Sequence, residues 1–316
     1  MRKRNLLLAA LGVTGAAAAA VAGGVAYFYN FAIVRTPDEK ENKDDLNYGV
    51  YGDVVRAGIQ WFREQNPEKI SLMSEDGLRL SAYYLPAKKE SNKAMVLMHG
   101  YRAKELADFS ALYQFYHEQG YHLLVPRQRS HSGCDGQYIT MGVKERFDCK
   151  LWAEYMNSRL GKDCNLYLSG ISMGCATVLM AADPEVGLPD NVRGIIADCG
   201  YTSPKDIFAH VLKSNYGLPD YPLLNMTEMI ARKKAGFGYE DVRIPEVMKK
   251  CHIPVLFIHG EKDTFVPTHM SIDNYLNCSA PKELLIVPNA VHATSSMENP
   301  ELYRSRAAAF MGKYAQ

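Results

Sequence analysis

One serine of this chain lies between two glycines at a spacing typical of a nucleophile. An apolar run leads into a G-x-S-x-G pattern, and the stretch reads Leu166-Tyr167-Leu168-Ser169-Gly170-Ile171-Ser172-Met173-Gly174. The apolar run predicts a strand and the residues after Gly174 predict a helix, so Ser172 would occupy a tight turn with its hydroxyl projecting. A side chain at either glycine would collide with the neighbouring strand or helix. The turn also places the hydroxyl at a helix N-terminus, where developing negative charge is favoured.

The stretch around Ser172 resembles the nucleophile turn of the α/β-hydrolase superfamily. In that superfamily the acid follows the serine after a later strand, and the histidine comes last in the chain. The apolar strand Val255–Ile258 leads to Asp263, and His292 lies in the loop beyond the strand Glu283–Val287. The resemblance therefore implies a catalytic triad. Ser172 attacks a carbonyl carbon, His292 takes the serine proton, and Asp263 orients His292 and stabilises its cation.

Two of these assignments have rivals elsewhere in the chain. Asp198 also ends an apolar strand, and some members of the superfamily carry the acid after that earlier strand. Asp263 is favoured because Gly260-Glu261-Lys262-Asp263, followed by Val266-Pro267, resembles the acid loop of the family. His292 is one of nine histidines. Among the others, His99 reads as structural or as scaffolding of the oxyanion loop, and His131 lies in a loop near the site.

The oxyanion of the reaction needs two preorganised N–H donors. The family pattern implies that one donor is the backbone N–H of Met173, the residue after the nucleophile. The other comes from the loop after the first parallel strand, which makes Tyr101 the second donor. This loop has an H-G-aromatic form instead of H-G-G-G. A further stretch, Pro126–Gly136, resembles the loop that braces the nucleophile turn in the family, with several positions replaced.

Alternating strands and helices must position these residues, and the apolar pattern predicts them from residue 70 onward. The alternation predicts the α/β class with a mostly parallel, doubly wound sheet covered on both faces. Expected parallel strands are Ala94–Met98, Tyr121–Val125, Leu166–Leu168, Val192–Ala197, Val255–Ile258 and Glu283–Val287. Expected helices are Tyr48–Gln65, Leu106–Gln119, Lys144–Arg159, Met173–Ala182, His269–Asn277 and Pro300–Tyr314. A hairpin of Ile70–Met73 and Leu78–Leu85 precedes the parallel strands.

One connection between the predicted strands is much longer than the others. About 60 residues separate Ala197 from Val255 where a single helix would suffice, and prolines punctuate them. We expect a short helical lid over the site at about residues 200–253. The alternative is extra helices packed on the edge of the sheet. The expected hydrolase domain is 70–316, preceded by a linker and N-terminal helix over 36–69.

The first 35 residues form a separate unit of the sequence. Three basic residues at positions 2–4 precede an uncharged stretch over 6–34, which is long enough to cross about 30 Å of hydrocarbon as a helix. A secretory signal has the same layout with a shorter apolar core, and the small residues before Gly23 fit a cleavage site. The aromatic stretch Tyr27–Phe31 favours an uncleaved anchor with these rings at the outer interface. An ordinary helix packed on the domain is the third possibility.

Composition excludes several other classes of protein. Lys and Arg number 36 against 35 Asp and Glu, which argues against a nucleic-acid binder. A hydrophobic content of 47% and a charged content of 22% argue against disorder. The seven cysteines are scattered, odd in number and without a C-x-x-C pair, so they predict neither a disulfide framework nor a metal site. No metal or organic cofactor is implied.

The sequence as a whole predicts a serine hydrolase that cleaves an acyl compound, preferably a carboxylic ester. It resembles bacterial, N-terminally anchored single-domain esterases related to prolyl-oligopeptidase-like and acetyl-ester hydrolases. The alternatives are a thioesterase or lipase at the membrane surface, a serine peptidase, and a non-catalytic binding protein on the same fold. The expected partners are a small-molecule or lipid acyl substrate and a membrane, reached through the N-terminal segment. The expected location is the cell membrane, as a single-pass protein with an extracytoplasmic catalytic domain, or outside the cell after secretion.

Overall fold

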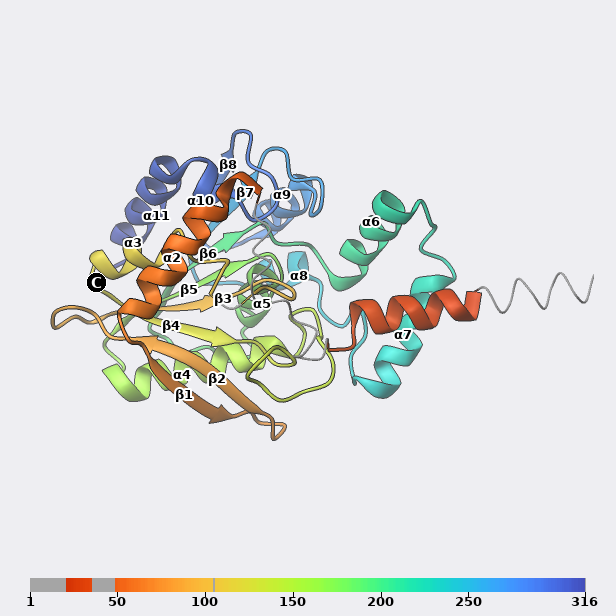
Figure 1. Cartoon of the computed structure of the whole chain (residues 1–316), viewed down its shortest axis with the longest axis horizontal. Helices are drawn as coiled ribbons and strands as arrows, with labels where there is room; N and C mark the ends of the chain where they lie inside the picture. Colours follow the sequence, from red (N-terminus) through yellow and green to blue (C-terminus); the bar gives the residue numbers. More distant parts are fainter. Residues whose placement is uncertain (1–20, 36–48, 105, 316) are drawn as a thin grey trace, which may run out of the picture.

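An eight-stranded sheet runs through the molecule, with helices on both of its faces (Figure 1). The computed structural model describes residues 21–35, 49–104 and 106–315. The strand order is β1-β2-β4-β3-β5-β6-β7-β8, and the pairs from β4 to β8 are parallel. The strands are β1 (Glu68–Met73), β2 (Arg79–Leu85), β3 (Lys93–Met98), β4 (Tyr121–Arg127), β5 (Asn165–Ile171), β6 (Val192–Asp198), β7 (Val255–Gly260) and β8 (Lys282–Val287). The predicted mostly parallel α/β sheet and its antiparallel N-terminal hairpin are confirmed.

Both faces of the sheet are buried, which explains the continuous apolar runs of the parallel strands. Along β5, Leu166 and Leu168 enter one core, whereas Tyr167 and Ile171 enter the other. One face carries the helices α2 (Gly52–Glu64), α3 (Tyr113–Glu118) and α11 (Pro300–Tyr314). The opposite face carries α4 (Glu145–Leu160), α5 (Met173–Ala181), α8 (Ile244–Met248) and α9 (Thr268–Asn277). The short α10 (Ser295–Glu298) precedes α11.

The predicted helix Leu106–Gln119 is wrong in its first half. The helix α3 begins at Tyr113, and turns occupy residues 106–112. Leu106 has a φ of +65°, a left-handed conformation that a regular helix does not contain. The turns also pack closely against α2, because a Cβ added at Gly58 would lie 2.0 Å from the carbonyl oxygen of Ser110. This close approach of two backbones leaves no room for a regular helix with side chains between them.

The long connection between β6 and β7 folds into helices, which fits both the expected lid and the alternative of extra packed helices. It contains α6 (Pro204–Tyr216), α7 (Leu223–Lys234) and α8. Figure 1 shows α6 and α7 projecting from the body of the molecule, beside a helix over residues 21–32. The Phe28 ring packs edge-on against Phe208 of α6, with ring centroids 5.5 Å apart. The insertion is therefore bound to the N-terminal helix as well as to the sheet.

The described residues give a partial view of the N-terminal segment. Among residues 21–35, 49–104 and 106–315, no helix is long and apolar enough to cross a membrane. The expected anchor or signal falls largely on residues 1–20, and the expected linker on 36–48, both outside the described residues. From residue 25 onward the helix is packed on the protein, since Val25, Phe28 and Ile33 are buried.

Candidate active site

Ser172 occupies the turn between β5 and α5, with φ +56° and ψ −116°. A Cβ added at Gly170 would lie 2.2 Å from the carbonyl oxygen of Gly174. A Cβ at Gly174 would lie 1.9 Å from the carbonyl oxygen of Met98 on β3. The steric reason predicted for both glycines is confirmed, and the turn holds Ser172 in a conformation that non-glycine residues rarely adopt.

Replacing Gly174 with alanine should therefore lower the free energy of unfolding by more than about 3 kcal/mol, because backbone atoms cannot move aside as side chains do. Urea unfolding of the two proteins measures the difference. Gly312→Ala is the matched control, since that glycine is exposed in α11 with nothing within 4 Å of an added Cβ. The control should gain up to about 1 kcal/mol. Equal stability of Gly174→Ala and the parent would contradict this account of the turn.

The structure brings Ser172, His292 and Asp263 together from three separate loops. The Nε2 atom of His292 lies 2.9 Å from Ser172 Oγ, and its Nδ1 atom lies 2.7 Å from Asp263 Oδ2. A carboxylate accepts only, so Nδ1 carries the proton and Nε2 accepts from the serine hydroxyl. The side chain of Asp263 is fully buried, whereas that of His292 is 22% exposed. This arrangement suits proton transfer from Ser172 to His292.

Asp263 is held as an anion by its neighbours. Its Oδ1 accepts the backbone N–H groups of Phe265 and Val266 at 3.0 and 2.9 Å. Burial alone would raise the pKa of Asp263, but the hydrogen bonds from His259, His292 and the Val266 N–H together hold that pKa well below its usual range. The carboxylate is therefore ionised at neutral pH and can stabilise an imidazolium on His292.

His259 is a second histidine on the same carboxylate, and no role was predicted for it from the sequence. Its Nε2 lies 3.2 Å from Asp263 Oδ2 and 2.8 Å from the carbonyl oxygen of Val266. Both neighbours are acceptors, so Nε2 carries the proton, and Nδ1 accepts from the Ser271 hydroxyl at 2.6 Å. The position of His259 at the end of β7, four residues before Asp263, was the available signal. His259 therefore holds the Asp263 carboxylate in position and takes no part in the hydrogen bond between His292 and Ser172.

Asp198, the rival acid, lies at the end of β6 and makes a different contact. It accepts a hydrogen bond from Ser295 Oγ at 3.1 Å, and the structure gives it no hydrogen bond to His292 within the described residues. Burial raises the pKa of Asp198 from 3.8 to about 7, although its neighbours His259, Ser295 and His292 act in the opposite direction. The geometry thus pairs His292 with Asp263.

The raised pKa of Asp198 predicts a pH-dependent stability. Between about pH 4 and pH 7 the folded protein keeps a proton that the unfolded chain releases, so stability falls as pH rises through this range. Asp198→Asn has no proton to lose, so its advantage over the parent should grow with pH and reach about 3 kcal/mol. Urea unfolding at the two ends of the range measures it, with the exposed Asp163→Asn as control. A pH-independent difference for Asp198→Asn would contradict the assignment.

The predicted oxyanion donors lie beside the nucleophile. The loop after β3 runs against Ser172, because a Cβ added at Gly100 would lie 3.3 Å from the serine Cβ. The N–H of Gly100 is already bonded to Asp108 Oδ2 at 2.6 Å. Within the described residues, the N–H groups of Met173 and Tyr101 have no hydrogen-bond acceptor. These two groups are therefore free to bind an oxyanion.

The loop after β4, which the resemblance implied as a brace of the nucleophile turn, contacts that turn and the loop after β3. Gln128 donates its side-chain amide to the carbonyl oxygen of His99 and accepts from Thr177 Oγ1 of α5 at 3.1 Å. His131 Nε2 accepts the backbone N–H of Arg102 at 3.0 Å. Burial lowers the pKa of His131 to about 3, so the ring stays neutral and remains an acceptor. The loop thus connects β3, the oxyanion loop and α5, and the structure adds which of its residues make these contacts.

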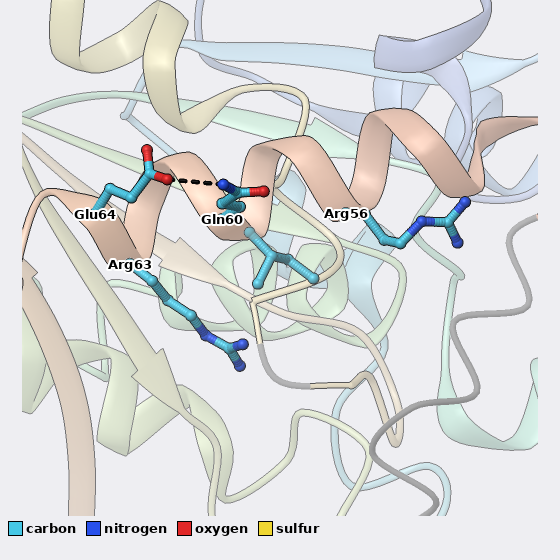
Figure 2. Close-up of a pocket in the computed structure, with 5 residues that line it drawn as sticks. Arg56, Gln60, Arg63 and Glu64 are labelled. Atoms are coloured by element: carbon cyan, nitrogen blue, oxygen red, sulfur yellow. Dashed lines mark hydrogen bonds between the residues drawn. The ribbon is translucent and has the colours of Figure 1, made fainter.

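A cavity of about 680 Å³ opens in front of Ser172. Its walls include the apolar side chains of Val50, Phe265 and Val291 and the basic side chains of Arg102 and Lys104. A smaller depression on α2 contains none of the triad residues, and it is lined by Arg56, Gln60, Arg63 and Glu64 together with Ile59 (Figure 2). The cavity lined by Ser172 and His292 is therefore the candidate substrate site.

One group of possible metal ligands exists among the described residues, and it overlaps the triad. The ligand atoms of Cys199, Asp263 and His292 lie within 4.8 Å of one another. Asp263 and His292 already bond to each other, and burial raises the pKa of the Cys199 thiol well above its usual value. A metal needs the thiolate. The group therefore fits a proton-transfer site better than a metal centre.

Comparison with known proteins extends over most of the chain. No family model matches it. The uncharacterized protein YqkD of Bacillus subtilis (strain 168) is 25% identical over 250 residues, which cover 79% of this chain and 81% of that protein. The esterase Pf2001 of Pyrococcus furiosus superposes with a TM-score of 0.66 at 20% identity, over 80% of this chain and 94% of the esterase.

A second solved structure leads to the same fold. The α/β hydrolase from Penicillium sp. sh18 superposes with a TM-score of 0.62 at 16% identity, over 79% of this chain and 99% of its own. Both likenesses cover about four fifths of the chain. The chain therefore has the α/β-hydrolase fold.

Proposed function

We propose that the protein is a serine hydrolase that cleaves carboxylic esters through an acyl-enzyme. The observation that carries this proposal is His292, which spans the 2.9 Å to Ser172 Oγ and the 2.7 Å to Asp263 Oδ2. Structural neighbours that are esterases or hydrolases give the proposal further support. A triad held in this geometry has the parts that acyl transfer needs.

The proposed reaction begins with attack of Ser172 Oγ on the substrate carbonyl carbon. His292 Nε2 takes the hydroxyl proton, and the N–H groups of Met173 and Tyr101 bind the oxyanion. The intermediate collapses when His292 gives its proton to the leaving oxygen, which releases the alcohol. A water molecule, activated by His292 in the same way, then hydrolyses the acyl-enzyme.

The cavity supports an acyl compound as the substrate. Its apolar walls beside the nucleophile, which include Phe265 and Val291, suit an acyl chain or an alkyl leaving group. Phe265 lies directly over the site, with its ring centroid 4.9 Å from that of His292. Such a ring excludes water from one side of the imidazole.

A panel of substrates with one common acyl group tests the proposal on the full chain. The panel contains a p-nitrophenyl ester, the corresponding thioester and the corresponding anilide. We expect kcat/KM to be highest for the ester. A higher value for the thioester would favour a thioesterase, and a higher value for the anilide would favour a peptidase. No turnover of any member, together with no reaction with a fluorophosphonate, would identify a non-catalytic binding protein.

A further inference from the structure

The helices α6 and α7 and the helix over 21–32 form one end of the molecule (Figure 1). Exposed apolar side chains are concentrated in these helices and in the loop between α6 and α7. These short segments supply eight of the fifteen large exposed apolar side chains of the described residues. We call this set the lid-end surface, and its members are Val21, Tyr27, Phe31, Tyr216, Leu218, Tyr221, Met226 and Met229. Scattered exposed apolar residues are normal, but a concentration at one end indicates an interaction surface.

Contacts between its members join the helix over 21–32 to the end of α6. The Tyr27 ring stacks on Phe31 with centroids 5.9 Å apart, and the Tyr27 side chain reaches Tyr216 at the end of α6. Tyr221 follows in the α6–α7 loop and is 72% exposed. Aromatic side chains with a polar tip are enriched where a protein meets the headgroup region of a bilayer.

The N-terminal helix divides into an exposed part and a packed part close to this surface. Residues 21–23 are exposed, whereas Val25 and Phe28 are buried against the protein. The uncharged sequence from Leu6 to Gly24 therefore precedes the packed part. These 19 residues would span about 28 Å as a helix, which matches one hydrocarbon core. The run thus has the length of one bilayer crossing and ends within the helix over 21–32, which carries the first members of the lid-end surface.

We propose that the lid-end surface rests on a lipid bilayer, with the rings of Tyr27, Phe31 and Tyr221 at the interface. Leu218 and the two methionines would then lie among the upper acyl chains. Lys213 on α6 and Lys233 on α7 are exposed on the same two helices, where they can meet anionic headgroups. The contact does not depend on the chemistry of Ser172.

Direct hydrogen bonds connect the helix of the proposed bilayer contact to the oxyanion loop of the site. Tyr101 Oη donates to the carbonyl oxygens of Phe31 and Ala32 at 3.0 and 3.1 Å, and Arg102 donates to that of Val34 at 2.8 Å. The loop that supplies the proposed oxyanion donor is thus bonded directly to the helix that meets the membrane. If the proposed function holds, the cavity mouth stands near the membrane surface, where lipid-borne acyl groups are presented.

Quenching by brominated lipids tests the surface in the full chain. The protein is reconstituted into vesicles of phosphatidylcholine and phosphatidylglycerol, with Tyr221→Trp as the reporter. Glu90→Trp is the matched control, because Glu90 is exposed in the β2–β3 loop. This loop precedes β3 and lies at the opposite end of the parallel strands from α6 and α7 (Figure 1). The native Trp61 and Trp152 give the same background in both. Met229→Trp repeats the test should Tyr221→Trp fold poorly.

We expect a several-fold larger loss of emission for Tyr221→Trp than for Glu90→Trp. The loss should be larger with bromine near the headgroup end of the chain than with bromine near its methyl end. Equal quenching of reporter and control would overturn the proposal. Protection of residue 221 from bromine, combined with cross-linking of two copies through this end, would overturn it in favour of a second copy of the chain.

Discussion

Ser172→Ala should lower kcat on the best ester substrate by about 10⁶-fold, because the attacking atom is lost while the rest of the site remains. The serine Oγ is the only atom of its side chain that reaches His292, at 2.9 Å, so alanine leaves the backbone and the histidine in place. Steady-state kinetics on purified protein measure the loss. Substrate affinity should change little, since the cavity walls are intact.

Ser169→Ala is the matched control for this substitution. Ser169 is buried in β5, the strand that leads into the turn, and it lies three residues before Ser172. It is not a member of the triad. The control should keep kcat close to that of the parent. Comparable losses in the two variants would mean that Ser172→Ala acts by disturbing β5, and the nucleophile would have to be sought elsewhere.

Asp263→Asn should lower kcat by about 10⁴-fold without unfolding the protein. The two backbone N–H groups at Phe265 and Val266 require an acceptor, so the asparagine oxygen must face them. The amide NH₂ then faces His292 Nδ1, which must accept. The Nε2 atom of His292 consequently carries the proton and can no longer take one from Ser172. The expected loss therefore comes from the wrong tautomer.

Asp198→Asn separates this effect from the loss of any buried carboxylate. Asp198 is equally buried, but its described hydrogen bond is to Ser295, not to His292. Its variant should retain turnover within a few-fold of the parent. The opposite result, an active Asp263→Asn and an inactive Asp198→Asn, would transfer the role of the acid to Asp198.

Local patterns were enough to predict the part of the site near Ser172. Glycine is required at 170 and 174 by contacts within a few residues or with the adjacent strand, and such constraints leave a short motif in the sequence. The positions of Asp263 and His292 followed from chain order in a resembling superfamily. The structure brings the two residues to Ser172 because parallel strands end at the same edge of the sheet.

Other features depend on contacts that no local pattern contains. The bond between Gln128 and Thr177 joins residues 49 positions apart, and His259 acts through a carboxylate on a different turn. The uncharged sequence over 6–34 predicted a membrane or export segment, yet the burial of Phe28 and Ile33 shows that its C-terminal part packs on the protein. An apolar run has the same composition whether lipid or protein covers it.

Labelling of the full chain with a fluorophosphonate tests the central claim most directly, because only an activated serine reacts with it. Intact mass should show one adduct per chain, and peptide mapping should locate it on Ser172. The adduct should be absent in Ser172→Ala and should form much more slowly in Asp263→Asn. A parent protein that does not react, or a Ser172→Ala variant that still does, would contradict the assignment of Ser172 as the nucleophile.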